Sequence, residues 1–355
     1  MEKRIREFDV VRVLAMFWVV TYHFGCEYAV GPYAPIMNFF CVTPNFDFGN
    51  VAVTMFLVLS GALLYGRYGK APIENLGAFY VKRFKTIYPP FWILNLYILV
   101  SMLRHWMSEG NLFFAGNPLK LLLTVVGFDG YFQLFGFDSY YFCGEWFVGA
   151  ILLLYLLFPL LTWMYRKCRF ALLIVLGLGY ILQFVWPNSW NWEISAFPAT
   201  LVLKFTLGFL LMDLLPKLRR GAVCWSSLLV FLVLCLADVP LPGLCKNDLL
   251  GTVAGISVFL LVLNFGNRIQ ETSLVWRSVQ KLAPVTYCVF LIQHIAIVWL
   301  QMAFVKVLGR PMETFDPWLC LGILAVTFAI TLMAAYGLKF VSDRAVKFVD
   351  RKFLS

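Results

Sequence analysis

The chain has 355 residues, of which 61% are apolar and 18% aromatic, while only 14% are charged. Its mean hydropathy of +0.81 lies far outside the range of soluble domains, so the composition excludes a soluble protein and indicates a polytopic membrane protein. The formal net charge of +10 comes from basic residues in short segments between apolar stretches, with no nucleic-acid-binding motif, so nucleic acid is not expected as a partner.

Ten apolar windows are long enough to cross a bilayer. They cover residues 10–28, 49–66, 88–104, 145–164, 169–187, 197–215, 222–238, 249–266, 284–304 and 317–340. A further apolar run near 118–128 is too short to cross and favours a re-entrant or interfacial helix. We therefore expect an all-α polytopic membrane protein of about ten transmembrane helices, without a separate soluble domain.

The first window follows three basic residues, as the apolar part of a signal peptide would. It lacks a small-residue cleavage site, however, and it contains Arg12 and His23. We therefore interpret this window as an uncleaved first membrane span.

Basic residues are distributed unequally between the two sets of connecting segments. If the amino terminus is cytoplasmic, 21 lysines and arginines lie on that side and only five on the opposite side. The positive-inside rule therefore predicts cytoplasmic termini for a multi-pass protein of the cell (plasma) membrane. On the outer side, the long segment 105–144 is rich in glycine, phenylalanine and tyrosine, which is typical of a folded cap over a cavity.

Nine cysteines are scattered along the chain without paired spacing, and no metal site is expected. Several lie within or beside apolar windows, where cysteine behaves as a small hydrophobic residue. Cys41, Cys143 and Cys245 are expected on the outer side, which leaves a disulfide among them open.

Arg12 and His23 lie eleven residues apart inside the first window. At about 100° per residue the spacing amounts to about 1100°, so both side chains share one helix face within about 20° and lie about 16 Å apart along the axis. Polar groups inside a membrane span face a cavity or a protein interior rather than lipid. The spacing therefore predicts one polar stripe that lines an aqueous cavity.

Each residue of this stripe has two interpretations. An imidazole normally titrates near neutral pH, so His23 is suited to accept a proton from a hydroxyl nucleophile, but a histidine that hydrogen-bonds a neighbouring helix is also compatible. Arg12 is suited to hold a phosphate or carboxylate, and it also follows Asp9 at the spacing of a helical ion pair. The residues alone leave these alternatives open.

Five stretches carry motifs in a fixed order. They are 8–15 followed by His23, 53–64 with a Ser-Gly pair, the basic segment 79–92, the tryptophan-to-proline stretch 146–160, and 286–294 with a late tyrosine and histidine. Together they resemble the membrane acyltransferase family 3, in which an arginine, ten residues and a histidine mark the first span. The resemblance covers most of the chain and implies a family domain over 1–345, followed by a cytoplasmic tail at 346–355.

Two of these stretches depart from the family's pattern. The basic segment of the family usually carries two arginines three residues apart, whereas here Arg83 is followed by Thr86. Gln293 occupies the place of the family's late histidine, and His294 lies about 100° further around the helix.

The resemblance implies transfer of an acyl group, commonly acetyl from acetyl-CoA, to a hydroxyl of an extracytoplasmic glycan, cell-wall polymer or similar acceptor. It assigns His23 as general base. Coenzyme A is cytoplasmic and its phosphates need basic partners there, for which the expected residues are Arg12, Lys82, Arg83 and Lys85. For the three residues of the basic segment, membrane topology alone is the alternative explanation.

Five further residues are candidates for acceptor binding or support, namely Asp9, Tyr22, Glu145, Trp146 and Lys204. Lys204 lies too deep in its span for easy snorkelling, and a cavity role and a structural role are both open. Glu145 is suited to orient an acceptor hydroxyl or the general base, or is an ordinary carboxylate at a helix start. The two aromatic residues either stack on a sugar or anchor the protein at the membrane boundary.

Ser60 and Gly61 invite comparison with a nucleophilic serine. Ser60 lies in an apolar window without a strand-turn-helix elbow, so a nucleophile is not expected. We interpret the pair as a helix-packing contact that allows two backbones to approach closely.

Two other classes of function remain open at this point. A transporter of a polar or anionic solute would use the same buried polar residues as a pathway, although the hydropathy shows no clear inverted repeat. A noncatalytic scaffold in a polysaccharide assembly complex is the other. For the transferase, the partners are membrane lipid, acyl-CoA and the acceptor. The identity of that acceptor and the acyl chain, acetyl or succinyl, depend on cavity shape contributed by several segments.

Overall fold

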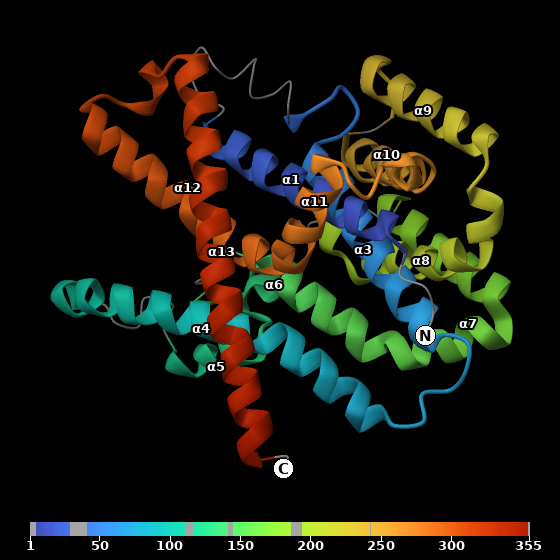
Figure 1. The fold of residues 1–355 in the computed structure, drawn as a ribbon, viewed down its shortest axis with the longest axis horizontal. Coiled ribbons are helices and arrows are strands. Elements are labelled where there is room, and N and C mark those ends of the chain that lie inside the picture. The colour runs from blue at the N-terminus through green and yellow to red at the C-terminus, as the bar shows by residue number, and fades with distance from the viewer. Residues whose placement is uncertain are drawn as a thin grey trace.

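The computed structural model describes residues 5–28, 41–110, 117–140, 145–185, 194–241 and 243–353. Over these residues the secondary structure is helical, apart from one isolated β-bridge between Val42 and Asp47. The α-helices are α1 (Glu7–Tyr28), α3 (Phe48–Tyr68), α4 (Leu76–Glu109), α5 (Leu121–Val126), α6 (Asp129–Gln133), α7 (Trp146–Val185), α8 (Pro198–Leu218), α9 (Gly221–Leu236), α10 (Gly243–Phe265), α11 (Leu274–Leu282), α12 (Thr286–Leu308) and α13 (Pro317–Phe353) (Figure 1). The 3₁₀ turns are η2 (Pro118–Lys120), η3 (Ile194–Ala196), η4 (Gly266–Arg268), η5 (Ala283–Val285) and η6 (Met312–Thr314).

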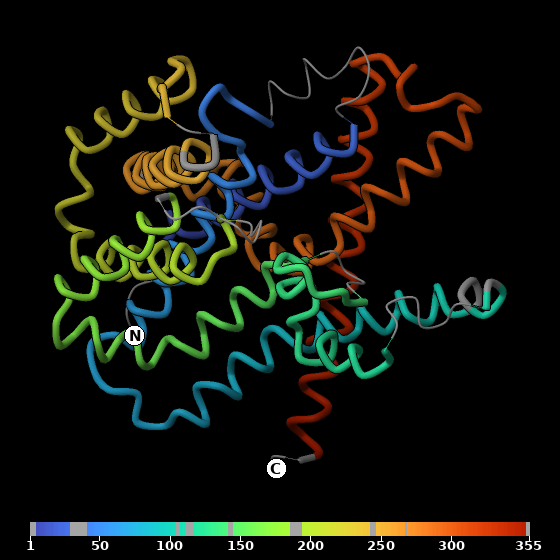
Figure 2. The backbone as a smooth tube through the Cα atoms, turned by 180° about the vertical axis from the view of Figure 1, so that it is seen from behind, coloured from blue at the N-terminus to red at the C-terminus, as the bar shows by residue number. Residues whose placement is uncertain are grey.

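Within the described part of the chain, eight helical stretches are long and apolar enough to cross a membrane, and α9 is a shorter apolar helix. The ten predicted windows each fall mainly within a helix, but 145–164 and 169–187 share α7. This helix has non-helical backbone angles at Cys168 (φ −151°, ψ 60°). Figure 2 shows that the chain changes direction within the range of α7. The prediction of an all-α polytopic membrane protein is confirmed.

Helices are the expected form for these windows because backbone groups in a bilayer must hydrogen-bond within their own segment. Their ends follow local chemistry. Asp47 precedes α3, and its Oδ1 accepts a hydrogen bond from the backbone N–H of Asn50 at 2.6 Å, which satisfies a donor at the helix start. The cap of α5 is Gly127 and that of α12 is Gly309, with φ values of 81° and 63° that glycine adopts without strain.

Helix α3 lies at the centre of one half of the molecule, where it packs most extensively on α8 and also on α1 and α10 (Figure 1). A side chain at Gly61 would place its Cβ 1.9 Å from the carbonyl oxygen of Phe205, and one at Gly208 would place it 2.2 Å from that of Val58. Only glycine fits at either position. The interpretation of Ser60 and Gly61 as a helix-packing pair is confirmed for the glycine.

The apolar run near 118–128 forms η2 and α5, a pair of short helices rather than a span. Two side chains of α4 hold its end: the hydroxyl of Tyr88 donates to the carbonyl oxygen of Val126 at 2.9 Å, and Nε1 of Trp92 donates to that of Val125 at 2.7 Å. Helix α6 follows and packs on α7. The expected cap at 105–144 is described in part, because 111–116 and 141–144 lie outside the described residues.

Of the three cysteines expected on the outer side, the structure describes the side chain of Cys41. Cys41 has a free thiol, which donates to the carbonyl oxygen of Thr21 at 3.5 Å. Cys143 and the side chain of Cys245 lie outside the part that the structure describes. At the other end of the chain, α13 continues without interruption from Pro317 to Phe353 and so includes most of the predicted tail.

Candidate functional site

A cavity of about 450 Å³ lies between α1, α3, α4, α7 and α12. Three arginines line it: Arg12 of α1, Arg67 of α3 and Arg83 of α4. Arg67 and Arg83 flank the reversal between α3 and α4, and Arg12 lies in the first two turns of α1, so all three belong to the same end. We call this space the arginine cavity. Its volume lies within the range of about 300–1,000 Å³ that small-molecule sites occupy.

The Arg83 side chain is held in place but keeps an unused donor. Its guanidinium carbon lies 5.6 Å from the ring centroid of Phe79 and 5.8 Å from that of Tyr155, which also lines the cavity. Its Nε is buried without a hydrogen-bond partner. Because a buried donor without a partner is costly, this group is suited to meet an acceptor oxygen of a ligand.

Arg12 is paired with Asp9 one turn earlier on α1. Its Nη1 lies 3.6 Å from Oδ1 of Asp9, and the arginine side chain is 30% exposed while the carboxylate side chain is 7% exposed. The two interpretations of Arg12 are therefore compatible, because the ion pair exists and the arginine still lines the cavity. Asp9 is suited to orient the guanidinium toward the cavity.

Two of the basic residues predicted to bind a donor do not line the arginine cavity. Lys82 is exposed, and Nζ of Lys85 forms an ion pair with Oδ1 of Asp350 in α13 at 2.6 Å. Thr86 does line the cavity, and its hydroxyl donates to the carbonyl oxygen of Lys82 at 2.8 Å. Among the described lining residues, the basic groups are the three arginines.

Aromatic rings line the end of the arginine cavity that lies away from the arginines. Along each of three helices the last lining residue at this end is a phenylalanine: Phe56 on α3, Phe147 on α7 and Phe290 on α12. The ring centroids of Phe56 and Phe147 are 6.2 Å apart, and those of Phe147 and Phe290 are 5.4 Å apart. We call these three residues the phenylalanine barrier.

Beyond the phenylalanine barrier, His294 of α12 meets His23 of α1. Their ring centroids are 4.9 Å apart with an interplanar angle of 60°. His23 is half-buried, with the ring of Tyr22 5.5 Å away, while Nδ1 of His294 is buried without a hydrogen-bond partner. His294 follows Phe290 by one turn, which places the two imidazoles about 6 Å further along α12. We call them the histidine pair.

Glu145 and Gln293 form a buried pair beside the same barrier. Nε2 of Gln293 donates to Oε1 of Glu145 at 2.9 Å, and both residues are buried. Burial raises the pKa of the Glu145 carboxyl well above its usual range, and the hydrogen bond from Gln293 opposes this effect. Trp146 packs edge-on against Phe147 at 5.7 Å. The residue in the place of the family's late histidine therefore engages this carboxyl group.

Lys204 lies in a buried ion pair that is separate from the arginine cavity. Its Nζ is 2.8 Å from Oδ1 of Asp248 and 3.1 Å from Oδ1 of Asn50, and the lysine side chain is completely buried. The hydroxyl of Tyr180 donates to Oδ2 of Asp248 at 2.5 Å. These four residues come from α8, α10, α3 and α7, which supports the structural role for Lys204.

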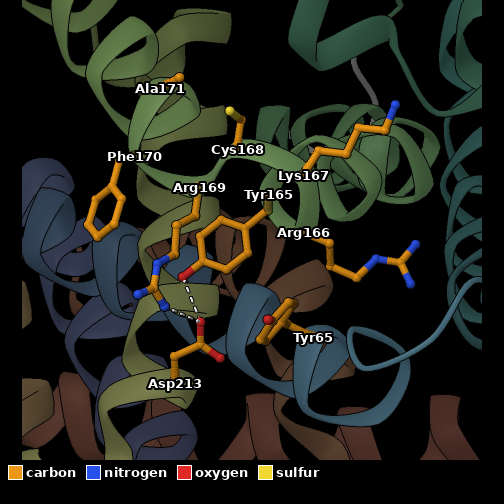
Figure 3. Close-up of a pocket in the computed structure, with 9 residues that line it drawn as sticks. All are labelled: Tyr65, Tyr165, Arg166, Lys167, Cys168, Arg169, Phe170, Ala171 and Asp213. Carbon is orange, nitrogen blue, oxygen red and sulfur yellow. Dashed lines mark hydrogen bonds and ion pairs between the residues drawn. The ribbon is translucent and has the colours of Figure 1, made fainter.

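A second cavity, of about 500 Å³, lies at the break of α7. The hydroxyl of Tyr165 donates to Oδ2 of Asp213 at 3.0 Å, and Nη1 of Arg169 lies 3.9 Å from the same oxygen. Figure 3 shows that Arg166 and Lys167 point away from this carboxylate. The lining residues include none of the predicted site residues, so the arginine cavity remains the better candidate for a substrate site.

A family model described as an acyltransferase domain matches residues 5–334. The chain belongs to the acyltransferase 3 family. This acyltransferase is therefore a transferase enzyme built as a multi-pass helical membrane protein, and the resemblance inferred from its motifs is confirmed. The match includes every helix that lines the arginine cavity. No curated protein and no solved structure matches the chain.

Two residues of the candidate site were not predicted from the sequence. Arg67 is not among the residues predicted to bind the donor, although Phe56, Leu63 and Arg67 recur at helical spacing and lie on one face of α3. His294 is only a weak candidate from the sequence, because it lies about 100° from the family's position. The structure explains its orientation: Gln293 faces α7 and His294 faces α1.

Proposed function

We propose that this acyltransferase transfers an acetyl group from cytoplasmic acetyl-CoA to a hydroxyl of an extracytoplasmic glycan or other cell-envelope acceptor, with His23 as general base. One observation carries the proposal. The arginine cavity and the histidine pair follow one another along the same two helices, from Arg12 to His23 on α1 and from Thr286 to His294 on α12. An anion-binding end and a proton-accepting end are thus aligned within one bundle.

The basic residues support the orientation of this path. They are concentrated at the ends of the spans where Arg67 and Arg83 lie, and the positive-inside rule assigns those ends to the cytoplasm. Both termini are then cytoplasmic, and the histidine pair lies toward the outer side. A donor that exists in the cytoplasm would reach the arginines first, while an acceptor from outside would reach the imidazoles.

The lining of the arginine cavity fits a coenzyme A thioester in two respects. Three guanidinium groups, one with an unused buried Nε, match the negative phosphates of the nucleotide part. The rest of the lining is mainly apolar, with residues such as Leu59 and Ile151, and suits a long, thin and largely uncharged arm. Tyr155 and Tyr287 add hydroxyl groups along the wall.

The chemical step is acyl transfer from sulfur to oxygen. The acceptor hydroxyl gives its proton to the imidazole of His23 while its oxygen forms a bond to the thioester carbonyl carbon. The carbon–sulfur bond then breaks, the proton that His23 accepted passes to the sulfur, and coenzyme A leaves as the thiol while the imidazole returns to its neutral form. The products are an acetyl ester and free coenzyme A. The imidazole of His294 lies beside this base, with the two ring centroids 4.9 Å apart.

The test uses the purified full-length protein in lipid vesicles with acetyl-CoA and a preparation of cell-envelope glycans. We expect release of free coenzyme A thiol that requires both substrates, together with acetyl ester on the glycan. Arg12→Ala should abolish this release, whereas Arg277→Ala, a change at an exposed position of α11, should leave it unchanged. Solute flux without thiol release would overturn the proposal and favour a transporter.

A further inference from the structure

The phenylalanine barrier lies between the residues proposed to bind the donor and those proposed to activate the acceptor. If the proposed function holds, the acetyl group must come to rest among these three rings, because the thioester carbonyl has to approach His23 from the arginine side. We propose that Phe56, Phe147 and Phe290 form the acyl-binding subsite of this acyltransferase and restrict it to short, uncharged acyl chains.

The arrangement of the barrier supports this subsite. Its three rings come from α3, α7 and α12, and each ends the cavity lining on its own helix. Phe147 touches both of the others, with centroid separations of 6.2 and 5.4 Å. Phe147 and Phe290 are only 8% and 9% exposed. Such a packed aromatic wall has room for a methyl group only where the rings meet the open cavity.

Packing limits the length of the acyl chain. Protein interiors are close-packed, so each added methylene would have to displace a ring or bend back toward the arginines. The residues behind the rings do not yield easily, because Glu145 and Gln293 form a buried hydrogen-bonded pair there. We therefore expect binding to weaken as the acyl chain grows beyond acetyl.

Charge limits the chemical class of the acyl group. All charged residues that line the arginine cavity are arginines, and they lie at the end of the cavity away from the phenylalanine barrier. A succinyl carboxylate placed among the rings would lose its water without gaining a cation, which is strongly unfavourable. Of the two acyl groups left open by the sequence, the barrier therefore selects acetyl.

The test is competition for binding to the full-length protein in detergent micelles. Radiolabelled acetyl-CoA is displaced by unlabelled acetyl-, butyryl-, hexanoyl- and succinyl-CoA. The variants are Phe290→Ala and the milder Phe147→Leu, with Phe170→Ala as control because Phe170 is 67% exposed and distant in sequence from the barrier. Size-exclusion profiles and melting temperatures select the variants that fold, and Phe147→Leu carries the test if the alanine variant does not fold.

For the wild type and the control, we expect affinity to fall from acetyl- to hexanoyl-CoA and succinyl-CoA to bind weakest. In Phe290→Ala, burial of each added methylene in the new space should improve binding by about fourfold, so the ratio of hexanoyl to acetyl affinity should rise more than tenfold. Free coenzyme A should bind equally to all variants.

Identical chain-length profiles in the wild type and both barrier variants would overturn the subsite. If the chain-length profiles are identical but the wild type still transfers acetyl groups, the proposed function stands and only the subsite is overturned. If the wild type binds no acyl-CoA, the proposed function and the subsite are both overturned.

Discussion

In the proposed function, the side chains of this acyltransferase's site divide into those that bind the charged donor and those that accept a proton. Arg12 and Arg83 present guanidinium groups to one cavity, and each is held by a neighbour: a carboxylate in one case and aromatic rings in the other. His23 instead meets a second imidazole. Changes at the two ends should therefore affect donor binding and chemistry separately.

Arg83→Lys should weaken donor binding more than it slows the chemical step. A lysine keeps the positive charge but lacks the planar fork and the buried Nε that is free to meet an acceptor. We expect the KM for acetyl-CoA to rise about tenfold with kcat nearly unchanged. Initial rates of thiol release measure both constants, and Arg277→Lys serves as the control. A fall in kcat at unchanged KM would place Arg83 in the chemical step instead.

Glu145 should make the stability of the protein depend on pH. Because burial raises the pKa of its carboxyl in the folded state, the proton stays bound in the folded protein at pH values where the unfolded chain has lost it. Stability should therefore fall as the pH rises from the ordinary glutamate range through the raised pKa. The melting temperature of the wild type is compared with that of Glu145→Gln from pH 5 to 8. The difference, wild type minus variant, should decrease as the pH rises. A difference that stays constant would contradict the raised pKa.

At the scale of helices, two contacts fix the frame on which the site is built. The glycine contact lets α3 and α8 approach, and the buried ion pair joins α8 to α10. The residues that form these two contacts are not among those that line the arginine cavity. They should matter for stability rather than for the chemistry of the active molecules.

Gly61→Ala should separate α3 from α8. The new Cβ would lie 1.9 Å from the carbonyl oxygen of Phe205, which is backbone and cannot rotate away. Overpacking of this kind costs about 1–3 kcal/mol, so the melting temperature in detergent should drop by several degrees. Gly177→Ala is the matched control, since no described atom lies within 4 Å of the Cβ position there. Equal melting temperatures for the two variants would show that the helices do not meet as described.

Lys204→Met should destabilise the protein strongly because it leaves Asp248 buried without its cation. Removal of one partner of a buried ion pair costs about 3–5 kcal/mol, whereas replacement of both partners by apolar residues is often nearly neutral. We therefore expect Lys204→Met/Asp248→Leu to be more stable than Lys204→Met in thermal unfolding. Folded molecules of each variant should keep the acetyl-CoA affinity of the wild type. Loss of acetyl-CoA affinity in the folded fraction would instead indicate that Lys204 takes part in binding the donor.

For the whole molecule, the sequence predicts the class of fold well and the site in part. Apolar length predicts windows that each fall mainly within a helix, yet it does not show that 145–164 and 169–187 share α7, in which the backbone angles at Cys168 are non-helical. Helical spacing places Arg12 and His23 on one face of α1, but the residues that line the arginine cavity include Arg12 and not His23. It cannot predict contacts between helices, and so it misses the pairing of His23 with His294 and that of Lys85 with Asp350.

His23 is proposed to remove the proton of the acceptor hydroxyl, and a comparison of binding with transfer in His23→Gln measures whether it does. The variant keeps a polar side chain of similar size but cannot act as a base at neutral pH. We expect acetyl-CoA to bind with the affinity of the wild type, while thiol release with cell-envelope glycans falls by about 10²-fold or more. Transfer at a rate close to that of the wild type, with binding intact, would show that His23 is not the general base.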